Sequence, residues 1–385
     1  MASGEWIIIN KPHYFSVDVM RIVHLSYAHI IEYSNPDDYL KRIDFFAVLL
    51  REMAKDLEVH SIHCINFKGI LNRDGVKYHF LKLEKYETII SFGINRYVSA
   101  LNPDVVLVHG MHFPLQVLFL RKQLGPHVKI VMQNHAEGPL RNYKGFLQRL
   151  VDKSVSAYFF TSLNQTTGWL KEGQIESDKK IYEVMEVPSV FYPMDKVEAK
   201  KRTGVSCEKI YLWVGRFDSN NDPITLVNGF IQFAKSNSDS CLYIIGHGGD
   251  LLPLVEKRLN SSPAEKERIK LIGKVEHSEL LYWYNSVDFI ISTSHYEGSG
   301  VAICEGMSCG NIPVLTDIAS FKMMLGTEPC GELYTPGDVH GLVSALEKCN
   351  QLSLPEASKK VLEQYNKNLS AVAISNKMIS VFKNI

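Results

Sequence analysis

Short apolar runs alternate with longer amphipathic stretches along almost the whole chain, and this alternation constrains the fold more than any other feature. The runs are nearly continuous in Val, Ile, Leu and Phe, which is typical of strands that helices cover on both faces. Strands that alternate with helices predict βαβ units and parallel sheets, so we expect an α/β fold. The expected strands span residues 21–27, 59–67, 105–109, 129–133 and 157–161, and then 210–214, 241–246, 269–272, 289–292 and 312–315.

This series of strands and helices occurs twice, and a chain of 385 residues is too long for one ordinary hydrophobic core. A hinge is expected near residues 187–192, where the run VPSVFYPMD has two prolines and no periodicity. We therefore expect two Rossmann-like domains, one of residues 1–190 completed by a C-terminal helix at about 366–385, and one of residues 191–365. Parallel sheets bind ligands beyond the carboxyl ends of their strands. Two such edges facing one another would form a cleft for two substrates, as a transferase requires.

The composition favours a small-molecule substrate. The chain has 42 basic and 42 acidic residues and a formal net charge of zero, whereas nucleic-acid binders usually carry clustered positive charge. The seven cysteines are scattered and include no C-x2-C pair. This pattern argues against a disulfide framework or a zinc site and predicts reduced thiols in the cytoplasm. Residues 1–19 lack the basic start and apolar run of a signal peptide, and no apolar stretch reaches the ~18 residues of a membrane span.

Two glycine-containing motifs follow expected strands in the second half. In VGRFD, Gly215 and Arg216 come directly after the strand YLWV, and an arginine there can bind a phosphate in a bidentate manner. In IIGHGGD, a strand ends at Gly246 and enters a turn that lets the backbone approach a ligand. Neither motif is specific alone. A solvent-exposed arginine and an ordinary tight turn stay open as alternatives, and the full G-x-G-x-x-G pattern of dinucleotide-binding proteins is absent.

The most informative segment is STSHYEGSGVAICEGMSCGNIPV. A strand is expected to end near Ser294, and Glu297 follows in a loop before a helix that is expected to start near Val301. Glu305 lies inside that helix, eight residues after Glu297. The two glycines of EGSG leave backbone N–H groups at the helix start uncovered, which suits a diphosphate or sugar hydroxyl groups. A carboxylate such as Glu305 can accept two hydrogen bonds from a ribose diol.

Residues 210–338 resemble the retaining GT-B glycosyltransferases of glycosyltransferase family 4. Glu297 and Glu305 match the E-x7-E motif of that family, and VGRF matches its G-R strand end. EGMSCGNIPV resembles E-A-M-x-x-G-x-P-V, with Gly306 in place of the usual alanine, and GELYTPGD resembles the closing stretch. The N-terminal half matches more loosely. There, VKIVMQNHAEGP resembles the fifth strand, with His135 where the family often places a histidine near the reacting centre.

The resemblance implies a GT-B fold, in which two Rossmann-like domains with parallel sheets face each other across a cleft. It implies an N-terminal acceptor domain and a C-terminal donor domain for a nucleoside-diphosphate sugar. Arg216 would neutralise the diphosphate, Glu305 would bind the ribose, and Glu297 would hold sugar hydroxyl groups. His135 would approach the sugar from the acceptor domain. Such enzymes retain the anomeric configuration and need no bound metal and no further cofactor.

These roles define the candidate site residues. The candidate catalytic residues are His135, Glu297 and Arg216. The backbone near residues 274 and 275 would contact the nucleotide base. The candidate donor-binding residues are Gly215, Arg216, Asn221, Gly246, Lys274, Val275, Glu297, Gly298, Ser299, Gly300, Val301 and Glu305.

The sequence departs from the family in two places. The family usually has a lysine about five residues after the arginine of G-R, where this chain has Asn221. One positive charge on the leaving group is therefore missing, and Lys274 or Lys322 is expected to take its place. The family often has a Gly-Gly loop after the first strand, where this chain has YAHIIEYSNPDDYL without a glycine. We expect this loop to be specialised for the acceptor.

The leading prediction is a hexosyltransferase that moves a sugar from a UDP- or GDP-linked donor to an acceptor hydroxyl of a glycan, a glycolipid or a small molecule. Bacterial polysaccharide biosynthesis is the context that the resemblance implies. A GT-B-fold sugar-nucleotide epimerase, a phosphorylase and a non-catalytic GT-B-fold binding protein are the alternatives. No G-x-S-x-G or P-loop motif occurs, which argues against an α/β-hydrolase and a P-loop ATPase.

The partners follow from the same prediction. We expect a nucleotide-sugar donor and an acceptor, no nucleic acid, and no obligate protein partner. We also expect no metal, because His109 and His112 in VLVHGMHFP have no carboxylate nearby in sequence to complete a site. The expected location is the cytoplasm. The basic runs at residues 179–180 and 200–202 are expected to form solvent-exposed surface. Peripheral contact of these runs with the inner face of a membrane stays open as an alternative.

Overall fold

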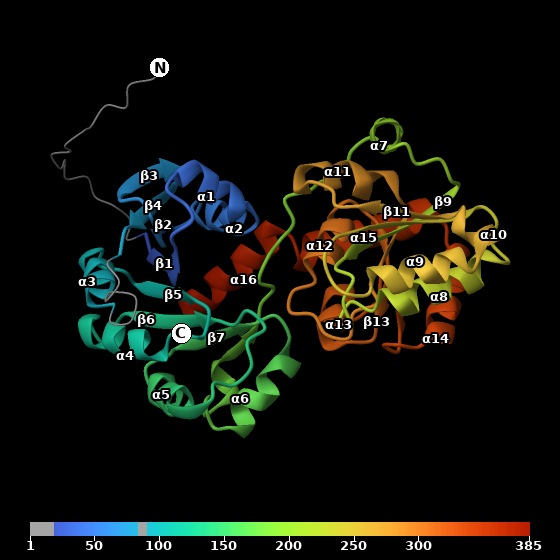
Figure 1. The fold of residues 1–385 in the computed structure, drawn as a ribbon. Coiled ribbons are helices and arrows are strands. Elements are labelled where there is room, and N and C mark those ends of the chain that lie inside the picture. The colour runs from blue at the N-terminus through green and yellow to red at the C-terminus, as the bar shows by residue number, and fades with distance from the viewer. Residues whose placement is uncertain (1–18, 84–90) are drawn as a thin grey trace, which may run out of the picture.

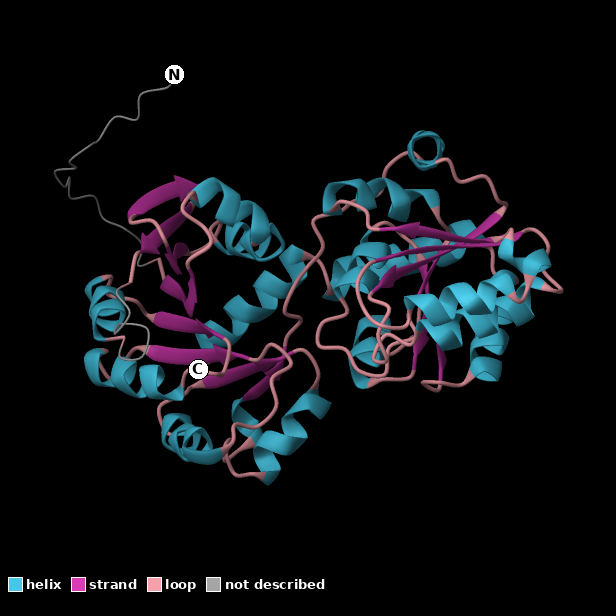
Figure 2. Cartoon of the chain, viewed as in Figure 1, coloured by secondary structure: helices cyan, strands magenta, loops and turns pink. Residues whose placement is uncertain are grey.

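The computed structural model describes residues 19–83 and 91–385 and contains two α/β lobes joined by a linker (Figure 1). Each lobe contains one sheet with helices packed on its faces (Figure 2). The expectation of an α/β fold with two Rossmann-like halves is confirmed.

The N-terminal lobe contains a sheet of eight described strands in the order β3-β4-β2-β1-β5-β6-β7-β8. All neighbours are parallel except β3 and β4, which form an antiparallel hairpin. The strands are β1 (Arg21–Ile30), β2 (Glu58–Ile65), β3 (Gly69–Arg73), β4 (Val76–Leu81), β5 (Val105–His109), β6 (Lys129–Gln133), β7 (Ala157–Phe160) and β8 (Ile181–Glu183).

Successive residues of a strand point to opposite faces of the sheet. Because both faces of this sheet are apolar, helices cover both of them. On β5, Val106 and Val108 belong to one apolar cluster, while Val105 and Leu107 belong to the other. The helices are α1 (Pro36–Arg42), α2 (Asp44–Met53), α3 (Phe92–Ala100), α4 (Pro114–Gln123), α5 (Asn142–Asp152), η2 (Leu163–Thr166), α6 (Thr167–Lys171) and η3 (Asp178–Lys180).

The C-terminal lobe contains a parallel sheet of six strands in the order β11-β10-β9-β12-β13-β14. Its strands are β9 (Lys209–Gly215), β10 (Ser240–Gly246), β11 (Ile269–Gly273), β12 (Phe289–Ile291), β13 (Ile312–Thr316) and β14 (Glu332–Tyr334). Its helices are α7 (Lys196–Thr203), α8 (Pro223–Ala234), α9 (Leu252–Asn260), α10 (Pro263–Lys266), α11 (His277–Ser286), α12 (Val301–Ser308), α13 (Ala319–Leu325), α14 (Val339–Asn350) and α15 (Leu354–Asn368), and α16 (Ala371–Asn384) follows at the end of the chain.

The chain crosses between the lobes twice. The linker after β8 packs on the C-terminal lobe, where the Ser189 hydroxyl lies 2.9 Å from that of Ser308 on α12. At the other end of the chain, α15 packs against α12, and α16 returns to pack against α2 of the N-terminal lobe. Figure 1 shows α16 lying among the elements of that lobe. The Phe382 ring on α16 lies 5.9 Å from the Phe159 ring on β7.

All ten expected strands are present, and within residues 19–83 and 91–385 the structure adds four that the sequence analysis missed. The β3–β4 hairpin turns at Asp74 and Gly75, which both have positive φ angles (50° and 80°). Such a D-G turn is a hairpin signal, but the flanking residues are too polar to have been identified as strands. The strands β8 and β14 have only three residues each. After β1, the chain forms two short helices, α1 and α2, which are divided at Ile43.

The expectation that all seven cysteines are free thiols is wrong for one pair. Cys207 and Cys241 form a disulfide, and the cysteines described as free are Cys64, Cys304, Cys309, Cys330 and Cys349. The pairing follows from the sheet, because β9 and β10 start side by side, with Ile210 opposite Cys241. Cys207 lies just before β9 and therefore beside Cys241, although 34 residues separate the two cysteines in sequence.

A group of histidines is buried in the N-terminal lobe. His24 Nδ1 lies 2.9 Å from the hydroxyl oxygen of Ser61, which lies 2.7 Å from His63 Nε2. The His109 ring lies 5.3 Å from that of His24 and 3.8 Å from that of His135. Burial lowers the pKa of His24 and His109 well below its usual value and lowers the pKa of His63 to about 3. These three imidazoles are therefore neutral in the folded protein at neutral pH.

We expect mild acid to destabilise the protein through these histidines. Their pKa is lower in the folded than in the unfolded chain, so below pH ~6.5 the unfolded chain binds more protons and the free energy of unfolding decreases. For His63 alone, the loss between pH 6.5 and pH 4 is on the order of 3 kcal/mol. Urea unfolding at pH 7, 6, 5 and 4 measures this loss in the free energy of unfolding. The His63→Gln variant cannot titrate and should lose stability less steeply, and parallel pH dependences for the two proteins would contradict this assignment.

Candidate active site

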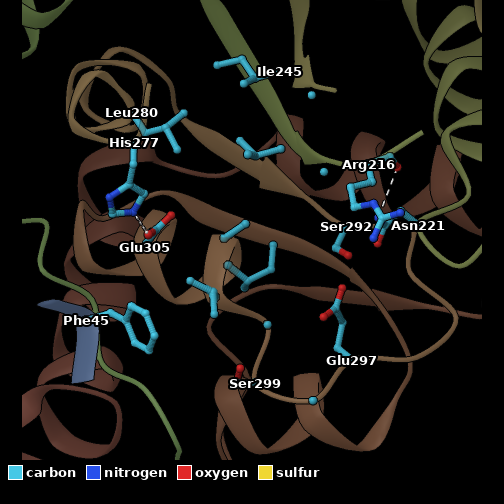
Figure 3. Close-up of a pocket in the computed structure, with 18 of the residues that line it drawn as sticks. Phe45, Arg216, Asn221, Ile245, His277, Leu280, Ser292, Glu297, Ser299 and Glu305 are labelled. Carbon is cyan, nitrogen blue, oxygen red and sulfur yellow. Dashed lines mark hydrogen bonds and ion pairs between the residues drawn. The ribbon is translucent and has the colours of Figure 1, made fainter. Parts of the chain in front are cut away.

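A cleft of about 970 Å³ lies between the lobes, at the carboxyl ends of β9 and β10 and against the loop after β6. Every candidate catalytic and donor-binding residue that the sequence predicted lines this one cleft. The structure therefore brings together His135 from the N-terminal lobe with both glutamates of the E-x7-E motif. Figure 3 shows Glu305 with His277 on one side, Arg216 with Asn221 on the other, and Glu297 between the two groups and closer to Arg216.

Glu305 is held by two side chains. It lies in the middle of α12 and is only 5% exposed. Its Oε1 lies 2.7 Å from His277 Nε2, and its Oε2 accepts a hydrogen bond of 2.9 Å from the Tyr284 hydroxyl. The hydrogen bond to Glu305 raises the pKa of His277 above its usual value. A carboxylate oxygen can accept two hydrogen bonds, so each oxygen of Glu305 keeps one position for a ligand.

Glu297 lies in the loop before α12 in a desolvated position. Burial raises the pKa of its carboxyl group, and the nearby charge of Asp218 raises it further, while a hydrogen bond from Ser294 opposes the shift. The Ser294 hydroxyl oxygen lies 2.8 Å from Glu297 Oε1 and 3.2 Å from Asn221 Oδ1. The hydrogen bond from Ser294 therefore orients the Glu297 side chain, which lines the cleft.

The N-terminus of α12 is open toward the cleft. The helix begins at Val301, as predicted, and no side chain caps it. Gly300 precedes it with φ +56°, a left-handed conformation that favours glycine. At Gly298, an added Cβ would lie 2.7 Å from the Cβ of Ala136 in the opposite lobe. The glycines of EGSG thus permit both the turn into the helix and the close approach of the two lobes.

Two further glycines bring the ends of β9 and β10 together. A Cβ on Gly246 would lie 2.2 Å from the carbonyl oxygen of Gly215, so no larger residue fits there. Arg216 follows at the cleft edge with 70% of its side chain exposed, and its Nε lies 3.5 Å from Asp218 Oδ2. The guanidinium group is therefore anchored weakly and is available to an anionic ligand.

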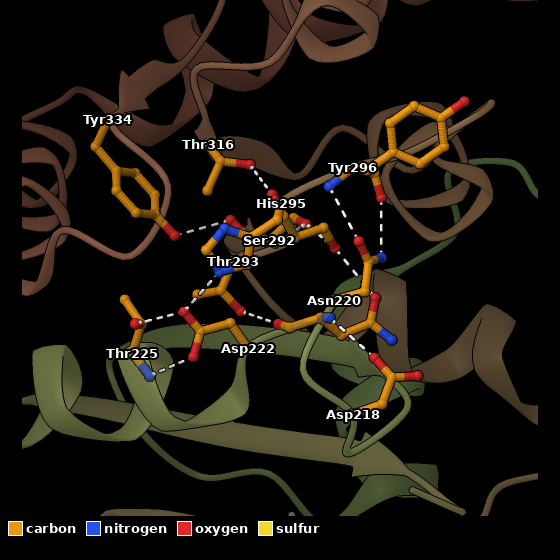
Figure 4. A network of polar contacts seen from close by, with 12 residues as sticks. Asp218, Asn220, Asp222, Thr225, Ser292, Thr293, His295, Tyr296, Thr316 and Tyr334 are labelled. Atoms are coloured by element: carbon orange, nitrogen blue, oxygen red, sulfur yellow. Dashed lines mark hydrogen bonds and ion pairs between the residues drawn. The ribbon is translucent and has the colours of Figure 1, made fainter. Parts of the chain in front are cut away.

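A polar network joins the loop after β9 to the loop that carries Glu297 (Figure 4). The Asn220 side chain donates to the carbonyl oxygen of Tyr296 and accepts from the Tyr296 N–H. The Thr293 hydroxyl donates to the Asn221 carbonyl, and the Asn221 side-chain amide donates to the carbonyl of Arg216 at 3.2 Å. Asn221, which replaces the family lysine, therefore holds the backbone that presents Arg216.

The positive charges in the cleft differ from those expected. Lys274 lines it, as predicted, but Lys322 is not among the described residues that do so, and it pairs with Asp317 at 2.7 Å instead. Of the two lysines considered as a replacement for the missing charge, Lys274 is therefore the one that the cleft contains. The N-terminal lobe contributes Lys41 and Arg42 from α1, directly after the segment that replaces the Gly-Gly loop. Sequence analysis identified that segment but did not single out these two cations.

His135 presents its ring from the N-terminal wall. Its Nδ1 is hydrogen-bonded to Glu186 Oε1, and its backbone N–H donates to Glu137 Oε2 at 2.6 Å. This contact with Glu186 fixes the orientation of the imidazole ring. Its Nε2 has no hydrogen-bond partner among the described residues. Glu186 was missed because it lies 51 residues from His135 in sequence and belongs to no recognised motif.

We expect Glu186→Ala to lower kcat about tenfold, because a hydrogen bond to a charged group is worth roughly 1.5 kcal/mol or more. Steady-state turnover of the variant measures this. The matched test is a double-mutant cycle with His135→Ala. If Glu186 acts by orienting His135, its removal should have little further effect in the His135→Ala background. Independent, additive losses would contradict that role.

The histidines of VLVHGMHFP do not come together as a pair of ligands. His109 is half-buried, whereas His112 is exposed and lies 3.7 Å from Glu137 Oε1. Over residues 19–83 and 91–385, no group of three or more His, Cys, Asp or Glu side chains is arranged to hold a metal ion. Metal independence stays a prediction.

Comparison with known proteins agrees with this geometry. Residues 208–351 match the family described as glycosyl transferases group 1. Over 253 residues, the chain is 24% identical to a lipopolysaccharide core biosynthesis mannosyltransferase of Rhizobium meliloti (strain 1021), a match that covers 59% of this chain and 72% of the relative. It is 27% identical over 236 residues to the GDP-mannose:cellobiosyl-diphosphopolyprenol alpha-mannosyltransferase of Xanthomonas campestris, a match that covers 58% of each chain.

The fold has solved counterparts. A glycosyltransferase from Rickettsia africae ESF-5 superposes with a TM-score of 0.71 at 14% sequence identity, covering 95% of this chain and 98% of that one. Two Rossmann-like lobes with a cleft between them define the GT-B fold. The C-terminal lobe is similar to the group 1 glycosyltransferases over those residues, and the chain is an enzyme of sugar transfer. The matches support this activity over the epimerase, phosphorylase and non-catalytic alternatives.

Proposed function

We propose that the protein is a retaining enzyme of glycosyltransferase family 4 that transfers a hexose from a UDP- or GDP-linked donor to an acceptor hydroxyl. The observation that carries the proposal is the position of Glu297 and Glu305 in one cleft, on either side of the uncapped N-terminus of α12. One glutamate is desolvated and the other is buried and doubly hydrogen-bonded. Such preorganised groups suit the recognition of a sugar at one end and a ribose at the other.

In the proposed complex, the donor lies along the edge formed by β9, β10 and α12. Glu305 accepts hydrogen bonds from the ribose diol, and the backbone near Lys274 and Val275 contacts the base. The N–H groups at the start of α12 and the guanidinium group of Arg216 bind the diphosphate. Glu297 and the EGSG backbone bind the hydroxyl groups of the sugar.

The chemistry requires a group that stabilises the leaving diphosphate. When the bond between the anomeric carbon and the phosphate oxygen breaks, negative charge grows on the β-phosphate. Arg216 and the N–H groups of α12 oppose that charge without moving, which is the main catalytic contribution of preorganised donors. The acceptor hydroxyl enters from the side of His135, and its proton passes to the departing phosphate oxygen as the new bond forms, so that the nucleoside diphosphate is released. No step in this scheme uses a metal ion.

The acceptor and location are proposed from the relatives. The printed names of the two bacterial relatives refer to lipopolysaccharide core and to a diphosphopolyprenol-linked saccharide. We therefore propose a saccharide of a surface glycan or glycolipid as acceptor, and action in the cytoplasm at the inner face of a membrane. GDP-mannose is the first donor to examine, because one relative's name specifies it.

Product analysis tests the proposal. The purified protein is incubated with GDP-mannose or a UDP-hexose and saccharide acceptors, and NMR reports the anomeric configuration of the product. The expected product has the configuration of the donor, forms in the presence of EDTA, and requires an acceptor but no orthophosphate. An inverted product would contradict retention. Conversion of the donor to an isomer without acceptor would indicate an epimerase instead.

A further inference from the structure

Two hydrogen bonds join the lobes where the EGSG loop meets the loop after β6. The Tyr296 hydroxyl donates to the carbonyl oxygen of Ala136 at 3.3 Å. From η2 of the N-terminal lobe, Gln165 Nε2 donates to the carbonyl oxygen of Gly298, also at 3.3 Å. Hydrogen bonds of this length are common around a site without its substrate and tighten when the substrate binds. Each lobe therefore holds a backbone carbonyl of the other, directly beside a candidate catalytic residue.

The side chain of Gln165 extends from a fixed element. Within η2, the Thr166 hydroxyl donates to the Leu163 carbonyl at 2.6 Å. The Leu163 N–H donates to the Glu183 carboxylate on β8 at 3.1 Å, which ties η2 to the sheet. A carbonyl oxygen only accepts hydrogen bonds, so the amide of Gln165 must present its nitrogen to Gly298. A donor that is mounted in this way can hold a neighbouring loop in one position.

Tyr296 connects three loops of the cleft. Ala136, which receives its hydroxyl, has a φ angle of 63°, a left-handed conformation that a residue with a Cβ adopts only when its surroundings hold it there. The backbone of Tyr296 is itself held by the Asn220 side chain, which donates to its carbonyl at 2.9 Å and accepts from its N–H at 3.1 Å. Figure 4 shows these two contacts, with the Tyr296 ring directed away from Asn220. Tyr296 thus links the loops after β9 and β12 to the loop that carries His135.

A small cavity lies beside the two contacts between the lobes. Its volume is about 150 Å³, and Gln165, Tyr296 and Glu297 are among the residues that line it. Several water molecules fit in such a volume, because each occupies about 30 Å³ in the liquid. Glu297 also lines the main cleft. The two hydrogen bonds therefore lie where water would approach the sugar end of the proposed donor site.

The geometry points to Gln165 and Tyr296 as a pair of positioning residues for the proposed sugar transfer, on which this inference rests. Gln165 holds the EGSG backbone that binds the donor sugar, and Tyr296 holds the backbone next to His135. Together they align the donor sugar with the acceptor wall and keep water from the reacting carbon, and such alignment accounts for a large part of the rate of a reaction between two substrates. Neither residue contacts the nucleoside end of the cleft at Glu305.

Two nearly isosteric substitutions test the pair. Gln165→Met keeps the length of the side chain, removes the amide donor and adds no charge beside Glu297, while Tyr296→Phe removes only the hydroxyl group. We expect each to lower kcat for sugar transfer about three- to tenfold, the effect of one lost hydrogen bond. The Kd for UDP or GDP should stay within about twofold of the native value, because the nucleoside end is unchanged.

The fate of the donor separates positioning from a merely structural role. When water takes the place of the acceptor, its oxygen bonds to the anomeric carbon and its proton passes to the departing phosphate oxygen. Free sugar and the nucleoside diphosphate are then the products. We expect the ratio of free sugar to transfer product to rise about threefold or more in both variants. A loss of folded protein alone would lower both products equally and leave this ratio unchanged.

Hydrogen–deuterium exchange tests the two contacts without any turnover. Since each hydrogen bond restrains the loop that it reaches, its removal should speed exchange locally. We expect faster exchange over residues 296–301 in Gln165→Met and over residues 135–138 in Tyr296→Phe. Melting temperatures should stay close to that of the native protein, because both contacts lie at the edge of the cleft rather than in the apolar core.

Matched controls have the same substitutions at exposed sites outside the cleft. Tyr143→Phe and Gln351→Met alter side chains that are exposed and do not line the cleft, and both should match the native protein in every assay. Native exchange together with a native product ratio in Gln165→Met and Tyr296→Phe would overturn the positioning roles. A native protein that transfers no sugar would contradict the proposed function instead, and unchanged exchange in the two variants would then overturn the contacts separately.

Discussion

Replacing Glu305 with alanine is expected to weaken nucleoside-diphosphate binding by about 100-fold or more. A hydrogen bond to a charged group is worth roughly 1.5–3 kcal/mol, and the ribose diol would lose two of them, which corresponds to the stated change in Kd. Glu305 is only 5% exposed, and His277 and Tyr284 already hold its carboxylate in position. Its side chain therefore loses little conformational entropy when the nucleotide binds. Isothermal titration with UDP or GDP measures the loss.

The same substitution also leaves the buried Tyr284 hydroxyl without its acceptor, so a loss of stability has to be separated from a loss of affinity. Tyr284→Phe removes that hydrogen bond and leaves the Glu305 carboxylate in the cleft. We expect Tyr284→Phe to bind the nucleotide far better than Glu305→Ala does, even if both melt earlier than the native protein. Equal affinity of the native and Glu305→Ala proteins would place the ribose elsewhere.

Arg216→Ala is expected to lower kcat by 100-fold to 1,000-fold, the effect of losing one preorganised donor to developing negative charge, roughly 2.7–4 kcal/mol. With 70% of the side chain exposed and one loose contact to Asp218, its removal should barely change the melting temperature. The loop itself is held through the Arg216 carbonyl by Asn221, and that contact survives the substitution. Initial rates of nucleotide release, measured at saturating donor, report the change.

Arg216→Lys is the matched control for charge. A lysine keeps one positive charge but loses the planar, bidentate geometry of the guanidinium group, so we expect activity between those of the native protein and Arg216→Ala. If the kcat of Arg216→Ala stays within about threefold of the native value, another cation of the cleft stabilises the leaving diphosphate instead: Lys274, Lys41 or Arg42.

The C-terminal half of the fold was predictable because its information is local. The nearly continuous apolar runs identified strands such as β9, β10 and β13, whose residues are buried on both faces. The E-x7-E spacing placed Glu297 before α12 and Glu305 inside it. Even the unusual Gly306 has a local reason, since a Cβ there would lie 3.1 Å from Ile290 on β12. Alanine would need Ile290 to shift by a few tenths of an ångström.

What sequence analysis missed depends on contacts between distant segments. His277 meets Glu305 across 28 residues, and Glu186 meets His135 across 51. The disulfide between Cys207 and Cys241 likewise follows from the pairing of β9 with β10. A single sequence contains no spacing rule for such pairs, because their proximity is created by the sheet order. The cations of α1 were overlooked for the same reason, since only the packing of the lobes brings that helix to the cleft.

The donor site is tested most directly by a thermal-shift measurement of the native protein and the Glu305→Ala variant against UDP, GDP and ADP. A ligand that binds only the folded state raises its melting temperature. A nucleoside-diphosphate donor site in this cleft predicts a clear rise with one diphosphate for the native protein and no rise for the variant. The absence of a shift with all three nucleotides, or an equal shift in the two proteins, would contradict it.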